Sequence, residues 1–372
     1  MLHSFSVKNF KGFKDEITLD LSKVKNYEFN TEVIRNGLAN TSIIYGYNGV
    51  GKSNLALAVV DIVLHLTDKY TNKDLYKNYM NADGTELIAE FTYTFKFNDS
   101  LLVYQYGKEN FETLVYEKLI IDSTEIISYD RRNKQSVKIE LSGTETLNKN
   151  AEQIKISVLK YIKGNAVFNE SKETLIFTEF LRFVDNMLLF WDRDNRMYQG
   201  YETGGHLIAD SIIKNNHFDD FKIFLKEAGL DTNIDFIKNN DKYEIFYSFP
   251  NKKISFWESA STGTKSLAHF YFWLQRIQYD ECPPSFVFID EFDAFYHTSL
   301  TRFIIGEIKK NNKCQFILTT HNTAVMTNEL LRPDCYFLMY KDRVQTLAEQ
   351  TDKELRYAHN LEKIYRSGLL NE

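Results

Sequence analysis

One segment of the chain combines glycines, a lysine and a serine in an order suited to binding phosphate. Residues 46–53 read Gly-Tyr-Asn-Gly-Val-Gly-Lys-Ser and match the pattern G-x-x-x-x-G-K-[ST] in full. Glycines let successive backbone N–H groups face an anion, Lys52 supplies a positive charge, and the hydroxyl of Ser53 is a ligand for Mg²⁺. A glycine-rich turn without a ligand is the less favoured interpretation. The segment predicts a nucleoside triphosphate site, with contacts from Gly46, Asn48, Gly49, Val50, Gly51, Lys52, Ser53 and Asn54.

Two carboxylates follow a short apolar segment later in the chain. Residues 286–289 read Phe-Val-Phe-Ile and lead directly into Asp290 and Glu291. In phosphoryl transfer, one such carboxylate can hold Mg²⁺ and the other can polarise the attacking water. We assign these roles to Asp290, as a metal ligand with Ser53, and to Glu291, as the catalytic base. Apolar strands that end in Asp-Glu are common, so this segment alone leaves both interpretations open.

Two further polar segments lie near these carboxylates in sequence. His321 follows the apolar segment 315–318 and two threonines, 31 residues after Asp290, and its imidazole can donate a hydrogen bond to a γ-phosphate. A histidine that merely ends a buried strand is the alternative. Residues 259–266 read Ser-Ala-Ser-Thr-Gly-Thr-Lys-Ser and open a predicted helix. They are either an ordinary helix cap or a set of donors, from Ser261 and Gly263, for a γ-phosphate held by a second copy of the protein.

The elements that must position these residues can be read from hydrophobic patterning. The segment 41–45 predicts a strand before the phosphate loop, and 55–66 predicts a helix after it. Alternating apolar residues predict two strands over 1–21 and antiparallel strands over 87–121. Spacings of three and four predict a helix that begins after Ser171 and continues through Met187 and Phe190, and a second helix over 218–228. Strands are predicted again at 243–249, 253–257, 285–289 and 315–319, with a helix over 264–278.

Composition limits the class of protein and its partners. The chain has 372 residues, 43% of them hydrophobic and 15% aromatic, and is therefore a folded protein. A net charge of −6 argues against a general polyanion-binding protein. Three distant cysteines favour a reducing compartment, and the longest apolar segment is about half a bilayer span, so we expect a cytoplasmic protein without a membrane partner.

Together, the order and spacing of these motifs resemble the ATP-binding-cassette ATPase superfamily, in the branch that contains RecF-like proteins and the structural-maintenance-of-chromosomes (SMC) heads. Residues 46–53 are then the P-loop and Asp290 and Glu291 the Walker B motif. The segment Ser261-Thr-Gly-Thr264 is similar to the signature Ser-Gly-Gly-Gln, with Thr at two of its positions. His297 stands where the SMC stretch Asp-Glu-Ile-Asp-Ala-Ala-Leu-Asp has its last Asp.

The resemblance implies an α/β fold, a P-loop head of the ATP-binding-cassette type with an antiparallel β subdomain. We expect head segments at 1–125 and 245–372, separated by a mostly helical insertion at 126–244. ATP and Mg²⁺ are the implied cofactors. Lys52, Glu291 and His321 are the implied catalytic residues, and Ser261, Gly263 and Thr264 of a second copy complete the site. A homodimer or an oligomer of dimers follows. No glutamine loop can be assigned.

The chain also resembles small bacterial ATPases of phage-defence and abortive-infection loci, similar to the ATPase domain of overcoming-lysogenization-defect nucleases. The residues after His321 are too few for a nuclease domain, so we expect a separate effector, a nuclease or toxin encoded nearby. The main alternative is a RecF-like DNA repair ATPase, which leaves DNA or RNA open as a partner. Its only candidate contacts are the basic groups Arg131, Arg132 and Lys134, and Arg193 with Arg196. A transporter subunit is disfavoured by the altered signature.

Overall fold

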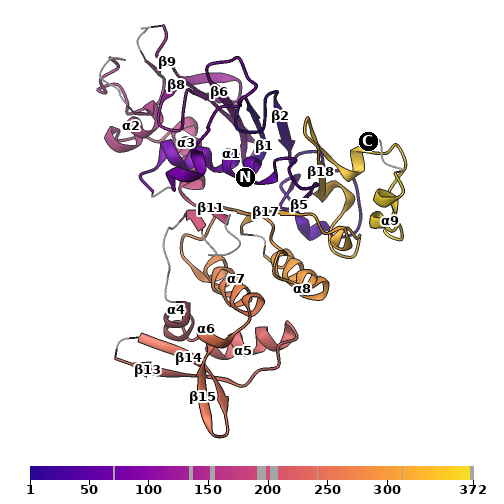
Figure 1. The fold of residues 1–372 in the computed structure, drawn as a ribbon. Coiled ribbons are helices and arrows are strands. Elements are labelled where there is room, and N and C mark those ends of the chain that lie inside the picture. Colours follow the sequence, from indigo (N-terminus) through magenta and orange to yellow (C-terminus); the bar gives the residue numbers. More distant parts are fainter. Residues whose placement is uncertain are drawn as a thin grey trace.

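A computed structural model describes residues 1–69, 72–133, 137–150, 156–190, 198–201, 208–240, 242–311 and 313–368. Figure 1 shows them as stacked layers, with one sheet at the top, a second sheet in the middle and a small third sheet at the bottom. Helices fill the spaces between the sheets. The predicted α/β class is confirmed.

The middle layer is a seven-stranded, mostly parallel sheet that carries the phosphate loop. Its strand order is β12-β11-β16-β17-β5-β18-β19, and only the two edge strands run antiparallel to their neighbours. Helix α1 covers one face and α7 and α8 cover the other (Figure 1), so the inner strands are buried on both faces and mostly apolar. The strands are β5 (Thr41–Tyr45), β11 (Met187–Phe190), β12 (Tyr198–Gly200), β16 (Phe286–Ile289), β17 (Gln315–Thr320), β18 (Tyr336–Met339) and β19 (Val344–Thr346).

The upper layer is the predicted antiparallel subdomain. Its seven strands follow the order β10-β9-β8-β7-β6-β1-β2. Alternate residues of the long strands are buried, which is the pattern of a sheet with one face against a core. Asn98, with a φ of 51°, begins the tight turn between β6 and β7. The strands are β1 (Leu2–Lys8), β2 (Ile17–Asp20), β6 (Ala89–Phe97), β7 (Ser100–Lys108), β8 (Leu114–Ile121), β9 (Thr124–Asp130) and β10 (Lys138–Ile139).

Helix α1 (Lys52–Leu66) lies between these two sheets and is tied to the upper one by a buried ion pair. The carboxylate of Asp61 accepts from Lys108 Nζ at 2.6 Å and from the hydroxyls of Tyr106 and Tyr79 at 2.8 and 2.9 Å. The side chains of Asp61 and Lys108 are 0% and 1% exposed. Because buried charges are tolerated only when they are paired and hydrogen-bonded, this cluster fixes the helix against the strands.

The remaining elements complete the layers. Apart from α1, the helices are α2 (Val158–Asn165), α3 (Lys172–Asp185), α4 (Ile208–Lys214), α5 (Phe218–Glu227), α6 (Phe256–Ser259), α7 (Thr262–Tyr279), α8 (Thr298–Lys309) and α9 (Leu361–Arg366). The lower sheet contains β13 (Ile234–Asn239), β14 (Lys242–Phe249) and β15 (Lys252–Ser255), and a small hairpin joins β3 (Ile34–Arg35) to β4 (Leu38–Ala39). No helix among the described residues is long and apolar enough to cross a membrane.

The segment predicted as a mostly helical insertion, residues 126–244, is more mixed than expected. It contains α2 to α5, but it also contributes strands to the upper, middle and lower sheets. The helical prediction was wrong at Met187–Phe190, which is strand β11 and pairs in parallel with β16. Four apolar residues buried on both faces have no periodicity that separates a strand from a helix. The domain boundaries themselves stay a prediction.

The helices predicted within that segment do form close to their expected positions. Ser171 caps α3 through a capping box with Thr174. Gly229 follows α5 with a φ of 84°, as expected for a left-handed helix stop. Their aromatic side chains are mainly core residues, since Phe177, Phe180 and Phe221 are fully buried.

Candidate active site

The phosphate loop leaves β5 and enters α1 as predicted. Gly49 and Gly51 have φ values of 81° and 108°, which side-chain-bearing residues rarely adopt. A Cβ at Gly51 would also lie 2.8 Å from the Phe13 ring, so the loop closes tightly over the N-terminal turn. Asn48 is exposed at the loop tip. The first backbone N–H groups of the 15-residue helix α1 have no acceptors within the helix, so an anion is favoured at this end.

The lysine of the loop is buried and held by the loop itself. Lys52 is 5% exposed, and its Nζ donates to the carbonyl oxygens of Gly46 at 2.8 Å and Tyr47 at 3.2 Å. These neutral acceptors place the ammonium group inside the loop. Phosphate oxygens are stronger partners for it, because hydrogen bonds between two charged groups are shorter and stronger than those to neutral carbonyls.

Asp290 and the phosphate loop meet across one intervening strand. Strand β17 lies between β16 and β5 and pairs in parallel with both, so the carboxyl ends of all three strands share one edge. There, Ser53 Oγ donates to Asp290 Oδ2 at 2.5 Å, and Thr319 Oγ1 donates to Asp290 Oδ1 at 2.6 Å. The structure thus brings Ser53 and Asp290 together as the sequence predicted.

These oxygen atoms suit the predicted metal. Mg²⁺ prefers hard oxygen ligands at about 2.0–2.1 Å in an octahedron, so neighbouring ligand oxygens lie about 2.9 Å apart. A hydroxyl and a carboxylate already in contact need to separate by only a few tenths of an ångström to become such neighbours. Ser53 and Asp290 therefore fit as two ligands of a Mg²⁺ ion, whose other ligands would be phosphate oxygens and water.

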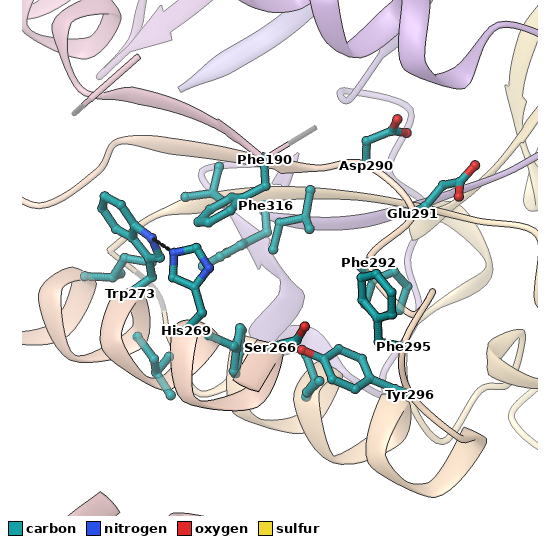
Figure 2. A pocket seen from close by; sticks show the side chains of 16 residues that line it. Phe190, Ser266, His269, Trp273, Asp290, Glu291, Phe292, Phe295, Tyr296 and Phe316 are labelled. Atoms are coloured by element: carbon teal, nitrogen blue, oxygen red, sulfur yellow. Dashed lines mark hydrogen bonds between the residues drawn. The ribbon is translucent and has the colours of Figure 1, made fainter. Parts of the chain in front are cut away.

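Glu291 is nearly buried and has a special backbone conformation. It is 9% exposed, and its φ of 47° lies in the left-handed region. Its backbone N–H donates to Thr319 Oγ1 at 2.7 Å. Figure 2 shows the carboxylates of Asp290 and Glu291 pointing away from the aromatic side chains beneath them.

The aromatic side chains beneath the carboxylates line a cavity of about 100 Å³ between the middle sheet, α7 and α8. Within it, Trp273 Nε1 donates to His269 Nε2 at 3.1 Å, as Figure 2 shows. Because Nε2 accepts this bond, the neutral imidazole carries its proton on Nδ1. Mostly apolar side chains therefore lie beneath the two carboxylates.

The segment after β17 carries the predicted histidine. His321 is exposed and immediately follows the strand end at Thr320. Thr320 Oγ1 donates to Asp293 Oδ1 at 2.8 Å and accepts from the Asn322 N–H at 2.9 Å. His321 therefore stands at the same sheet edge as the phosphate loop, and a role in contacting the γ-phosphate stays a prediction.

Helix α9 packs against this segment. Thr323 Oγ1 donates to Glu362 Oε1 at 2.7 Å and accepts from Arg366 Nη2 at 2.7 Å. The Tyr365 ring meets Tyr45, the last residue before the phosphate loop, at 4.9 Å between centroids. Burial, and then hydrogen bonding to Tyr47, raises the pKa of Tyr365.

The signature-like turn lies elsewhere in the same chain. Ser261 is exposed and caps α7, accepting from the Thr264 N–H at 3.1 Å. Figure 1 places the adjoining helix α6 beside the lower sheet, far from the edge that carries the phosphate loop. Gly263 packs closely on the chain after Walker B, since a Cβ there would lie 2.8 Å from the Phe295 carbonyl oxygen. One chain therefore does not bring Ser261, Gly263 and Thr264 to its own phosphate loop.

His297, which replaces the last Asp of the SMC pattern, has a local structural role. Its Nδ1 accepts from the Leu300 N–H at 3.4 Å and caps α8.

The basic groups noted in the sequence are engaged locally as well. Arg132 forms an ion pair with Asp130 at 2.8 Å, and Arg131 lies over the Tyr129 ring. Lys134, Arg193 and Arg196 lie outside the described residues.

Sequence patterns missed three residues of this site: Thr319, Thr320 and Asp293. The available signal was the pair of hydroxyls between a buried strand and His321. Small hydroxyl residues at the carboxyl end of a parallel strand lie at the edge where such sites form.

Comparison with known proteins gives one family match and several similar structures. Residues 42–327 match a protein family described as "AAA domain, putative AbiEii toxin, Type IV TA system". No curated protein matches the sequence. Among solved structures, the chain is similar to the SMC head bound to the C-winged helix domain of ScpA, with 15% identity, a TM-score of 0.48, and 93% and 97% of the two chains covered. It is also similar to the SMC head domain from Thermotoga maritima, with 15% identity, a TM-score of 0.44 and 93% and 98% coverage.

Proposed function

Because the chain belongs to this family of AAA domains, with the ATP-binding-cassette type of ATPase head that its motifs predict, we propose that it binds and hydrolyses ATP with Mg²⁺ as a homodimeric switch. The observation that supports this proposal best is the cluster at one sheet edge. Ser53, Asp290 and Thr319 are joined there by hydrogen bonds of 2.5 and 2.6 Å.

Four residues at this sheet edge have distinct roles in the proposed reaction. The loop N–H groups and Lys52 bind the β- and γ-phosphates, while Ser53 and Asp290 hold the metal ion, which neutralises charge on the phosphates when bound. Glu291 accepts a proton from the attacking water as that water approaches the γ-phosphorus in line with the leaving oxygen. Such general-base catalysis contributes about 10²–10⁴-fold to a rate.

The separation of the signature turn from the phosphate loop within one chain supports the homodimer. In the proposed dimer, Ser261 and the Gly263 N–H of one chain donate to the γ-phosphate bound by the other. The positive end of the 18-residue helix α7 adds to this attraction. Loss of the γ-phosphate removes these contacts and loosens the dimer, so hydrolysis acts as the switch.

We further propose a role in bacterial anti-phage defence, in which the ATPase controls a separate effector. Support comes from the family description, which names an AbiEii toxin and a toxin–antitoxin system. The RecF-like alternative predicts DNA binding that changes ATP turnover. Copurification of the untagged chain with its neighbouring gene product, followed by a DNA-dependence assay, separates the two roles.

The central test uses Glu291→Gln, which keeps the shape of the side chain and removes the base. We expect kcat to fall about 1,000-fold, while ATP stays bound and traps the dimer. Sedimentation with ATP and Mg²⁺ measures the dimer, and wild-type protein with ADP is the control. A monomeric Glu291→Gln protein saturated with ATP would contradict the proposed switch.

A further inference from the structure

Thr319 forms hydrogen bonds with each of the three residues 290–292, which include the two carboxylates. Its Oγ1 donates to Asp290 Oδ1 at 2.6 Å and accepts from the Glu291 N–H at 2.7 Å. Its carbonyl oxygen accepts from the Phe292 N–H at 3.1 Å. Thr319 itself is 0% exposed. One residue of β17 thus holds three consecutive residues that follow β16.

The hydroxyl of Thr319 acts on the two carboxylates in different ways. By donating to Oδ1 of Asp290, it leaves Oδ2 directed at Ser53, where the metal ion is expected. By accepting from the Glu291 N–H, it satisfies a buried donor in a residue whose φ is 47°. Non-glycine residues rarely adopt this conformation, and they persist in it when surrounding contacts hold them.

The next residue repeats the arrangement one position later. Thr320 Oγ1 donates to Asp293 Oδ1 at 2.8 Å and accepts from the Asn322 N–H at 2.9 Å. Neighbouring hydroxyls at the end of β17 therefore join the Walker B segment on one side to the segment of His321 on the other. A shift of either segment would strain its own hydrogen bond to Thr320, which also contacts the other segment.

We propose that Thr319 is a positioning residue of the hydrolysis site, whose single hydroxyl orients Asp290 for Mg²⁺ and Glu291 for the attacking water. This inference rests on the proposed ATPase function and adds a residue to its site. A purely structural threonine would support folding alone, whereas a positioning threonine affects kcat and the Mg²⁺ dependence of nucleotide binding.

The test compares Thr319→Val with Thr319→Ser. Valine keeps the β-branched shape and the carbonyl bond to Phe292, but it removes both hydroxyl contacts. We expect kcat of Thr319→Val to fall about 10- to 100-fold with KM changed less than threefold, since hydrogen bonds to charged groups are lost. Thr319→Ser retains the hydroxyl, and we expect it to recover most of the rate.

Two measurements do not depend on turnover. Hydrogen exchange of the peptide containing Glu291 should accelerate in Thr319→Val without nucleotide, because its N–H loses its acceptor. The extra thermal stabilisation that ATP gives with Mg²⁺ over ATP with EDTA should shrink in Thr319→Val and persist in Thr319→Ser.

Thr346→Val is the matched control. Thr346 is also a strand threonine with 0% exposure, and its Oγ1 donates to a carboxylate oxygen of Glu349 at 2.9 Å, away from the site. We expect its kcat to equal that of wild type. Wild-type turnover and exchange in Thr319→Val would overturn the positioning role. A wild-type protein without ATPase activity would instead overturn the proposed function, and the exchange measurement would still test the contact with Glu291.

Discussion

The phosphate-loop edge and the signature turn differ in how complete they are within one chain. At the edge, side chains from α1, β17 and the segment after β16 contact one another directly. At the turn, the Ser261 side chain bonds only within its own helix start, to the Thr264 N–H and hydroxyl, among the contacts described. The phosphate-loop part of the proposed site is therefore assembled within one chain, whereas the signature turn would act only on the site of a second chain in the proposed dimer.

The largest effect that tests this comparison is expected in the assembled half. Lys52→Ala removes the buried ammonium group, and losing about 3 kcal/mol of charge-assisted hydrogen bonding weakens ATP binding about 100-fold. Titration with a fluorescent ATP analogue measures the affinity of Lys52→Ala and of wild type. Lys23→Ala, which removes a half-exposed lysine, should bind as wild type does. Unchanged affinity in Lys52→Ala would refute the phosphate-binding role of the loop.

A smaller effect tests whether the second half acts in trans. Ser261→Asp keeps a good helix cap but places a negative charge where the partner's γ-phosphate is expected. We expect Ser261→Asp and Lys52→Ala to be inactive separately. Mixed in equal amounts, half of the dimers would carry one complete site, so about a quarter of the wild-type rate should return. A mixture no more active than its two components would contradict a role of Ser261 in trans.

The smallest effect separates the capping role of Ser261 from its proposed contact with phosphate. Ser261→Ala removes the cap of α7 and should lower the free energy of unfolding by about 1 kcal/mol, whereas Ser261→Asp should not. Denaturant unfolding without nucleotide measures this difference. Ser259→Ala, which alters a neighbouring exposed serine outside the cap, is the control. Equal free energies of unfolding for Ser261→Ala and wild type would show that Ser261 does not stabilise α7 as a cap.

Residues that belong to a sequence motif could be placed in the site from the sequence, whereas a single buried threonine could not. The phosphate loop and the Asp290–Glu291 pair were predictable, because parallel strands bring their carboxyl ends to one edge and place their polar residues together. Thr319 was not predicted as a site residue, because a threonine in a buried strand is usually a packing residue. Its hydrogen-bond partners depend on the register between β16 and β17.

The fold was predictable to a similar depth. The strands of the antiparallel subdomain alternate clearly, and the helices after Ser171 and Ser261 have recognisable caps. Strand β11 was missed because its four apolar residues show no strand periodicity and because its parallel neighbour β16 lies far along the sequence. The contact of α9 with Thr323 could not be foreseen either, since it arises only from tertiary packing.

The ion pair between Asp61 and Lys108 restricts how this protein can diverge. Replacing one member leaves the other charge buried without its counterion, at a cost of about 3–5 kcal/mol, while replacing both with apolar residues of similar volume is often neutral. Since the free energy of unfolding of a protein is about 5–15 kcal/mol, replacing one member of the pair would remove a large part of it. The two positions should therefore drift together during evolution, and a homologue that has lost the aspartate should lack the lysine as well.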